Sequence, residues 1–87
     1  MEILYTDKAA KELRKIAGNN KKIAELIIKK IESYLKNPTG KHDIKILKGK
    51  FASFKRLRAG DYRIIFDEEN NVMYIYEIKY RKEAYKW

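Results

Sequence analysis

The hydrophobic residues change their spacing near the middle of the chain, and this change constrains the fold more than any other feature of the sequence. Between residues 7 and 36 they recur with the period of a helix, whereas from Phe54 onwards they alternate or form short apolar runs, as strands do. The 87 residues suffice for one domain, residues 1–87. A domain of this size buries a modest core, so single substitutions in it are expected to be costly.

The first half of the chain predicts a short strand over residues 3–5 and then two helices. Either Thr6 or Asp7 is expected to cap the first helix. Its apolar face comprises Ala9, Leu13, Ile16 and Ala17. Residues 18–20, Gly-Asn-Asn, should end this helix with a C-cap and a turn, and residues 21–36 should form the second helix. Two helices joined by so short a turn indicate an antiparallel helical hairpin.

The second half predicts a three-strand meander. Its strands are expected over residues 54–58, 62–67 and 72–78, and residues 59–61 and 68–71 form the turns between them. The last strand is apolar enough to be central in a sheet. The predicted fold is therefore α+β, with an N-terminal strand and a helical hairpin packed on a largely antiparallel sheet.

The chain is strongly basic, and its excess charge is concentrated in two segments. It has 21 Lys and Arg against 12 Asp and Glu, a net charge of +9. Residues 41–63 contribute +6 and residues 79–87 contribute +3, while the charges of the other segments cancel. Such a field favours a polyanionic partner, although a lysine-rich surface can equally serve solubility alone.

The arginines add detail to this pattern, because four of the five lie in the second half among aromatic residues: Arg56, Arg58, Arg63 and Arg81. Guanidinium groups pair with phosphates, and aromatic rings stack on exposed bases. A basic sheet face with nearby rings therefore favours single-stranded RNA over duplex DNA.

Composition excludes several classes of site. The chain has no cysteine and one histidine, His42, so disulfides, thiol chemistry and Cys- or His-rich metal sites are ruled out. We expect no cofactor, and we expect His42 to lie exposed in a loop. No apolar run approaches the roughly 20 residues that span a bilayer, and Met1 begins no signal-peptide pattern. The sequence therefore predicts a cytoplasmic protein without membrane association.

Three stretches of the chain resemble the RelE/ParE toxin superfamily. They are Leu47-Lys48-Gly49, residues 54–66 (FKRLRAGDYRIIF) and residues 78–85 (IKYRKEAY). They are similar to the family's Leu-x-Gly turn, to its basic strand followed by Arg-x-Gly-Asp-Tyr-Arg and an apolar strand, and to its ending, in which an arginine precedes a tyrosine. The order of elements also matches over the whole length. The resemblance implies a RelE-like fold.

The resemblance also implies a function. RelE-type members bind in the ribosomal A site and cut the mRNA codon there by attack of the 2′-hydroxyl on the adjacent phosphorus. ParE-type members share the fold but poison DNA gyrase and lack the cleavage residues. An antitoxin wraps and neutralises the toxin. The expected partners are a RelB-like antitoxin, which we expect to be acidic or amphipathic, and the ribosome with A-site mRNA.

Site residues follow from the resemblance by position. Arg63 matches the arginine that contacts the scissile phosphate, and Arg81 matches the one assigned to transition-state charge or leaving-group protonation. Tyr85 matches the tyrosine that stacks on the base or helps proton transfer. Arg56 matches one of two strand lysines, whereas the other lysine position falls on Phe54, a departure from the family pattern. The RNA-binding residues are expected to be Lys48, Lys50, Lys55, Arg58 and Lys82.

The general base is not identified by the sequence, because guanidinium groups do not give up their protons. Tyr85, Lys55 and Lys50 are candidates, and positioning of the RNA by the ribosome alone is another possibility. Strand alternation places Lys55 on the face opposite Phe54 and Arg56. In a purely structural interpretation, the arginines pair with Glu77 or Glu83, Tyr62 and Phe54 pack, and Gly60 is a turn glycine.

The sequence thus predicts a type II toxin that acts as a ribosome-dependent mRNA endonuclease. Two alternatives stay open: a ParE-like gyrase inhibitor, and a degenerate member that only binds its antitoxin or RNA. The arginines and Tyr85 favour the endonuclease, and the Phe54 departure keeps the degenerate member under consideration.

Overall fold

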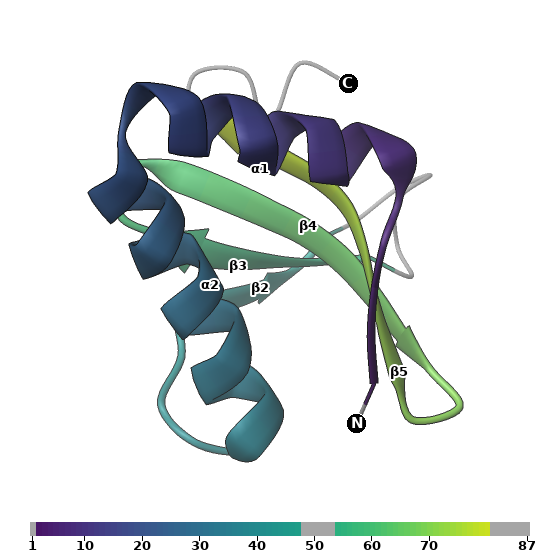
Figure 1. The fold of residues 1–87 in the computed structure, drawn as a ribbon. Helices are drawn as coiled ribbons and strands as arrows, with labels where there is room; N and C mark the ends of the chain where they lie inside the picture. Colours follow the sequence, from purple (N-terminus) through teal and green to yellow (C-terminus); the bar gives the residue numbers. More distant parts are fainter. Residues whose placement is uncertain (1, 48–53, 81–87) are drawn as a thin grey trace.

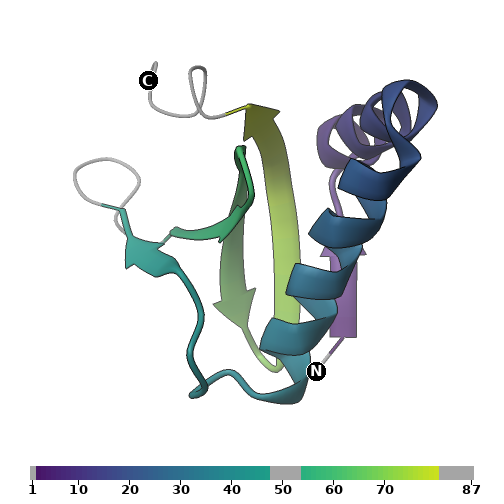
Figure 2. The same cartoon turned by 90° about the vertical axis from the view of Figure 1, so that its left-hand side faces the viewer.

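The computed structural model describes residues 2–47 and 54–80. Its elements are β1 (Glu2–Tyr5), α1 (Asp7–Asn19), α2 (Lys21–Lys36), β2 (Ile44–Ile46), β3 (Lys55–Ala59), β4 (Tyr62–Glu69) and β5 (Val72–Tyr80). The strands form one sheet in the order β1-β5-β4-β3-β2 (Figure 1). Figure 2 shows both helices on one side of this sheet. The prediction of an α+β fold with a largely antiparallel sheet is confirmed, since β1 alone pairs in parallel, with β5.

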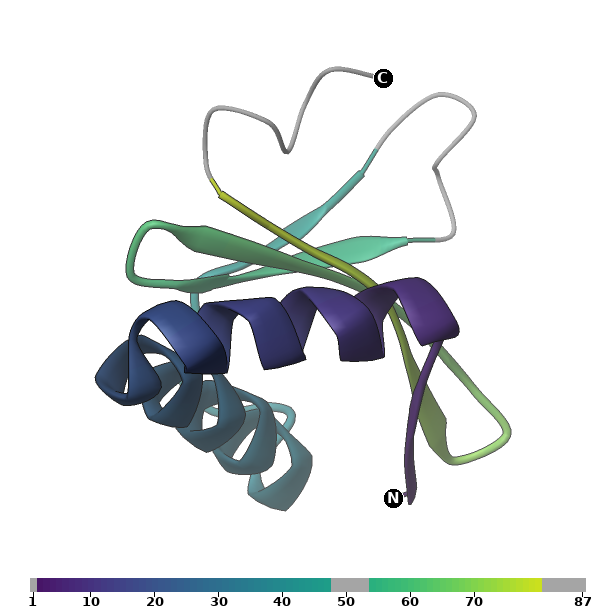
Figure 3. The same cartoon turned by 45° about the horizontal axis from the view of Figure 1, so that its top comes forward.

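The helix boundaries are set by two polar side chains. Thr6 caps α1: its Oγ1 accepts a hydrogen bond from the Ala9 N–H at 3.0 Å and donates one to the Tyr76 carbonyl at 2.9 Å. Asn20 ends α1 and also caps α2, where its Oδ1 accepts from the Ile23 N–H at 3.2 Å. The break predicted over residues 18–20 is therefore confined to Asn20, whose extended backbone is enough to redirect the chain. The helices diverge from this point as a V rather than lying antiparallel (Figure 3).

Tight turns join the last three strands and carry them further than predicted. Gly60 has φ 61° as the first residue of the two-residue β3–β4 turn. Asn70 and Asn71 have φ 52° and 63°, as a type I′ hairpin requires. The short turn at residues 70–71 lets β4 extend to Glu69, and the pairing of Tyr62 with Tyr80 carries β5 to Tyr80.

One strand is missing from the prediction. Residues 44–46 form β2, which pairs with β3 at the edge of the sheet. Three residues, Ile-Lys-Ile, are too few to establish a strand period, so this pairing is decided by β3 and not by the local sequence. The predicted order, a strand, two helices and a three-strand meander, did not include β2.

The core lies between the helices and one face of the sheet. Its largest side chain is Phe66, which is 0% exposed and meets Tyr34 of α2 edge-to-face, with ring centroids 5.2 Å apart. A bulge at Tyr76 lets Ile75 and Ile78, three residues apart, both face this core. Ile65 is also 0% exposed but stands outside that cluster, because it points to the other face of the sheet.

Candidate functional site

The sheet face that points away from the helices gathers three of the predicted site residues, and we call it the arginine face. Leu57, Ala59 and Ile64 point into the core. The alternating Arg56 and Arg58 on β3 and Arg63 on β4 therefore point the other way. Arg58 lies directly opposite Arg63, and Arg56 lies opposite Ile65. The fold thus brings Arg56, Arg58 and Arg63 together on two adjacent strands.

Asp43, just before β2, holds two of these arginines. Its Oδ1 is 3.1 Å from Nη2 of Arg56, and its Oδ2 is 3.9 Å from Nη1 of Arg58. Its backbone carbonyl also accepts the Arg58 N–H at 3.0 Å. The Arg56 side chain is only 9% exposed. A guanidinium so deeply buried and paired supports the face, so it is poorly placed for the direct catalytic contact expected of Arg56.

Arg63 differs from its neighbours because it has no acidic partner among the residues that the structure describes. It is half-buried, and its Nε and Nη1 are buried without a hydrogen-bond partner. A guanidinium stays protonated, and burying its donors unpaired is costly. These N–H groups are therefore suited to bind an anion that residues 2–47 and 54–80 do not supply.

A carboxylate lies diagonally from Arg63 on the same face. Glu77 of β5 pairs in register with Ile65, while Arg63 pairs with Lys79. The Glu77 Oε1 is 2.6 Å from Nζ of Lys8, and its Oε2 is buried without a hydrogen-bond partner. The structural interpretation, in which Arg63 pairs with Glu77, was therefore wrong. Sequence reasoning gave Glu77 and Asp43 no functional role, because neither belongs to a local motif.

Lys55 is not part of the arginine face, as strand alternation predicted. Its Nζ lies 3.3 Å from Oε1 of Glu68, on the helix side of the sheet. The same oxygen accepts a hydrogen bond from the Tyr34 hydroxyl. Lys55 was a candidate base only if other positive charges crowded it. Its ion-pair partner is instead the Glu68 carboxylate. Burial and the hydrogen bond and charge of Glu68 raise the pKa of Tyr34 above the ordinary tyrosine range.

Phe54 and His42 are both engaged within the protein. Phe54, at the family's lysine position, stacks on Tyr76 with ring centroids 4.6 Å apart, so the prediction that it packs is confirmed. His42 is half-buried rather than exposed: its Nε2 donates to the Asn37 carbonyl at 2.6 Å, and its ring meets Tyr34 edge-on. The remaining predicted site residues lie outside the described part of the chain: Lys48, Lys50, Arg81, Lys82 and Tyr85.

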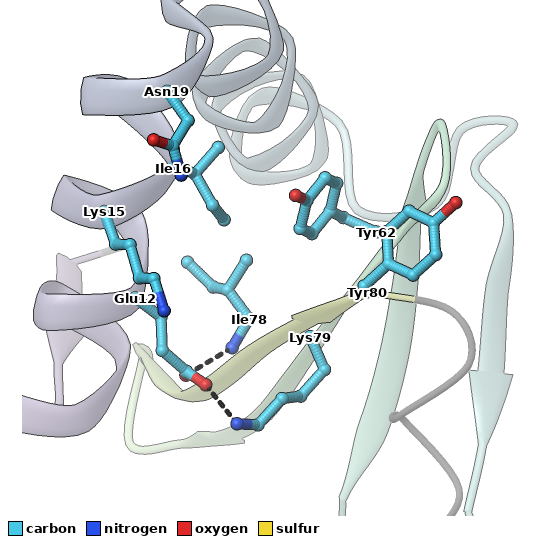
Figure 4. Close-up of a pocket in the computed structure, with 8 residues that line it drawn as sticks. All are labelled: Glu12, Lys15, Ile16, Asn19, Tyr62, Ile78, Lys79 and Tyr80. Atoms are coloured by element: carbon cyan, nitrogen blue, oxygen red, sulfur yellow. Dashed lines mark hydrogen bonds and ion pairs between the residues drawn. The ribbon is translucent and has the colours of Figure 1, made fainter.

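A cavity of about 260 Å³ opens between α1 and the ends of β4 and β5 (Figure 4). Glu12 spans it, accepting the Ile78 N–H at 2.9 Å and pairing with Nζ of Lys79 at 2.6 Å. The rings of Tyr62 and Tyr80 meet edge-on at its far wall. Tyr62 and Ile78 alternate with the residues of the arginine face, so the cavity belongs to the helix side. It is smaller than the roughly 300–1,000 Å³ usual for ligand pockets.

No three His, Asp or Glu side chains in residues 2–47 and 54–80 gather as they would around a metal ion. Neither helix in these ranges is long and apolar enough to cross a membrane.

Sequence comparisons relate the whole chain to known toxins. The family model for the "ParE toxin of type II toxin-antitoxin system, parDE" matches residues 3–85. Toxin RelE3 of Methanocaldococcus jannaschii is 28% identical over 87 residues, which cover 100% of this chain and 98% of that protein.

Solved structures share the fold. A chain in the RelB–RelE antitoxin–toxin complex from Methanococcus jannaschii has a TM-score of 0.72 and 24% identity, with 97% of this chain and 96% of that chain covered. The YoeB/ParE toxin from Agrobacterium tumefaciens has a TM-score of 0.79 and 15% identity, with 92% of this chain and 98% of that chain covered. A chain of the YoeB–YefM complex from Staphylococcus aureus has a TM-score of 0.79 and 22% identity, covering 92% and 95%.

Proposed function

The chain belongs to the RelE/ParE toxin family of type II toxin–antitoxin systems, and on this basis we propose that it is an endoribonuclease that cuts mRNA on the ribosome. The observation that carries the proposal is Arg63, whose buried Nε and Nη1 have no hydrogen-bond partner. Its neighbour Arg58 adds a second positive charge. The scissile phosphate of an RNA strand would supply the anion that Arg63 lacks among the described residues.

In the proposed reaction the 2′-hydroxyl attacks the adjacent phosphorus and the 5′-oxygen leaves. Arg63 donates to the phosphate oxygens and stabilises the charge of the phosphorane, which is often the largest catalytic contribution. Arg58, whose side chain is 45% exposed, binds the RNA strand next to the scissile phosphate. We assign to Arg81 the stabilisation of transition-state charge, because a guanidinium group does not give up its proton. Tyr85 stacks on the substrate base or helps proton transfer, as the family resemblance implies. Lys48, Lys50 and Lys82 contact flanking phosphates.

The ribosome is the proposed partner in catalysis, because the described part of the arginine face is small. Arg56 is neutralised by Asp43, and Phe54 is stacked on Tyr76. A codon held in the A site is already positioned, so the ribosome would supply orientation that the protein would otherwise have to provide for free RNA. We therefore expect cleavage of naked RNA to be much slower than cleavage on the ribosome.

A small antitoxin is the proposed regulatory partner. The structures of related folds include a RelB–RelE complex and a YoeB–YefM complex. The net charge of +9 would speed association with an acidic antitoxin segment that covers the arginine face.

Gyrase inhibition is the second candidate function, and the engagement of Arg56 and Phe54 within the protein favours it. Pulse labelling after induced expression separates the two. The endonuclease proposal predicts that incorporation of labelled methionine stops before incorporation of labelled thymidine, and that Arg63→Ala prevents this. Arg14→Ala, an exposed arginine on α1, is the matched control. Early loss of thymidine incorporation, with inhibited supercoiling by purified gyrase, would instead establish the second function.

A further inference from the structure

Glu77 is a half-buried carboxylate with no role so far in the proposed attack on phosphorus. Its side chain is 19% exposed, and its two oxygens have different surroundings. Oε1 pairs with Nζ of Lys8 at 2.6 Å, whereas Oε2 is buried and accepts no hydrogen bond. A buried acceptor left without a donor is rare in folded proteins and calls for an explanation.

The position of Glu77 in the sheet brings its side chain close to that of Arg63, the proposed ligand of the scissile phosphate. Glu77 pairs with Ile65 and Arg63 pairs with Lys79, so Glu77 and Arg63 are diagonal neighbours on adjacent strands of one face. Such neighbours are about 7–8 Å apart at their Cα atoms, within the reach of long side chains. The bulge at Tyr76 immediately precedes Glu77, and bulges beside functional sites commonly redirect a side chain.

The unpartnered atoms of this pair are complementary to one chemical group. Arg63 leaves two N–H donors unpaired and Glu77 leaves one acceptor unpaired, and neither set satisfies the other. A ribose 2′-hydroxyl next to a phosphate offers the reverse, one donor beside an anion. We propose that Glu77 is the general base that deprotonates the attacking 2′-hydroxyl. This role rests on the proposed endonuclease function.

Oε2 of Glu77 takes the 2′-hydroxyl proton as the 2′-oxygen forms its bond to phosphorus, and the bond from phosphorus to the 5′-oxygen breaks. The 5′-oxygen leaves with a proton from a protein donor or from water, and the other product is a 2′,3′-cyclic phosphate. Lys8 holds Oε1 and so orients Oε2. Lys55 cannot replace Glu77, because Lys55 lies on the helix side.

Single-turnover cleavage of mRNA on stalled ribosomes tests the role. Glu77→Gln keeps the shape of the side chain and removes the base, so the rate should fall about 10²- to 10⁴-fold while ribosome binding is retained. Glu69→Gln, an exposed glutamate at the end of β4, is the matched control and should cleave as wild type does. A Glu77→Gln protein with the wild-type rate would overturn the role and leave the endonuclease function standing. No cleavage by wild type would overturn both.

Two further readouts separate a base from a structural residue. With a substrate whose 5′-bridging oxygen is sulfur, the leaving group needs no proton, so the loss in Glu77→Gln should persist; recovery of the rate would assign Glu77 to leaving-group protonation instead. The second readout is the pH dependence of the wild-type rate, because carboxylates in general are already ionised at neutral pH and a carboxylate base predicts no rise above it. A tenfold rise for every pH unit above neutrality would rule out a carboxylate base, even if the variant failed to fold.

Discussion

Arg63 of β4 lies directly opposite Arg58 of β3, so two guanidinium side chains occupy one cross-strand pair. Like charges in such a pair destabilise a sheet by roughly 0.2–1 kcal/mol. The buried, unpartnered Nε and Nη1 of Arg63 add to this cost. Arg63 is therefore expected to be retained for function at the expense of stability.

Replacing Arg63 with an apolar side chain of similar length should stabilise the fold. Arg63→Met removes the like-charge pair and the buried donors, so the free energy of unfolding should increase by about 1 kcal/mol. Urea unfolding of the purified protein measures this change. Arg58→Met, at a 45% exposed side chain, should give a smaller increase. A clear loss of stability in Arg63→Met would show that Arg63 is a structural residue.

The Tyr34 hydroxyl should contribute measurably to stability through Glu68. Tyr34→Phe keeps the ring contacts with Phe66 and His42 and removes only the hydrogen bond to the carboxylate. Hydrogen bonds to charged groups contribute about 1.5–3 kcal/mol, so we expect a loss in this range. A double-mutant cycle with Glu68→Gln measures the coupling. Additive effects of the two substitutions would contradict the account.

The same tyrosine predicts a loss of stability at high pH. Burial and Glu68 raise the pKa of Tyr34 in the folded state, while an unfolded tyrosine ionises at about 10. The stabilisation of neutral Tyr34 is therefore complete below about pH 10 and declines as the pH rises above it. Burial, and then the charge of Glu32, also raise the pKa of Tyr5, which adds to the decline. Urea midpoints between about pH 8 and pH 11 should fall less steeply in Tyr34→Phe, and identical slopes would refute this.

Two glycines should respond oppositely to alanine. Gly60 has φ 61°, and an added Cβ would lie 3.3 Å from Cδ2 of Leu26, so Gly60→Ala should cost about 1–2 kcal/mol. Gly18 is helical, and its added Cβ meets nothing within 4 Å, so Gly18→Ala should stabilise α1 by about 0.5–1 kcal/mol. Thermal unfolding of both variants gives the signs directly. Equal shifts would mean that backbone conformation at Gly60 does not limit the β3–β4 turn.

Local signals predicted much of this fold. Thr6 and the span of α2 follow from capping and helical period, and Gly60 follows from its place between two alternating segments. The capping, helical and turn features are encoded by neighbours in sequence, so the structure agreed with them. The family pattern singled out Arg63 because that motif is continuous in the chain, and the role of Arg63 stays a prediction.

What sequence reasoning missed depends on contacts between distant segments. β2 exists because β3 offers it a partner, and Asp43 matters because that pairing places it beside Arg56 and Arg58. The free oxygen of Glu77 depends on register across two strands and on Lys8 from α1. The spacing of residues along the sequence does not reveal these contacts, because they form only when the strands pair.

Mapping the cut on a defined ribosome complex tests the central claim most directly. An end-labelled mRNA with a known codon in the A site is incubated with wild-type protein, Arg63→Ala or the control Arg14→Ala. We expect cleavage within that codon that leaves a 2′,3′-cyclic or 3′-phosphate, a rate about 10²- to 10³-fold lower for Arg63→Ala, and an unchanged rate for Arg14→Ala. An intact mRNA with folded wild-type protein, or equal cutting by Arg63→Ala, would contradict it.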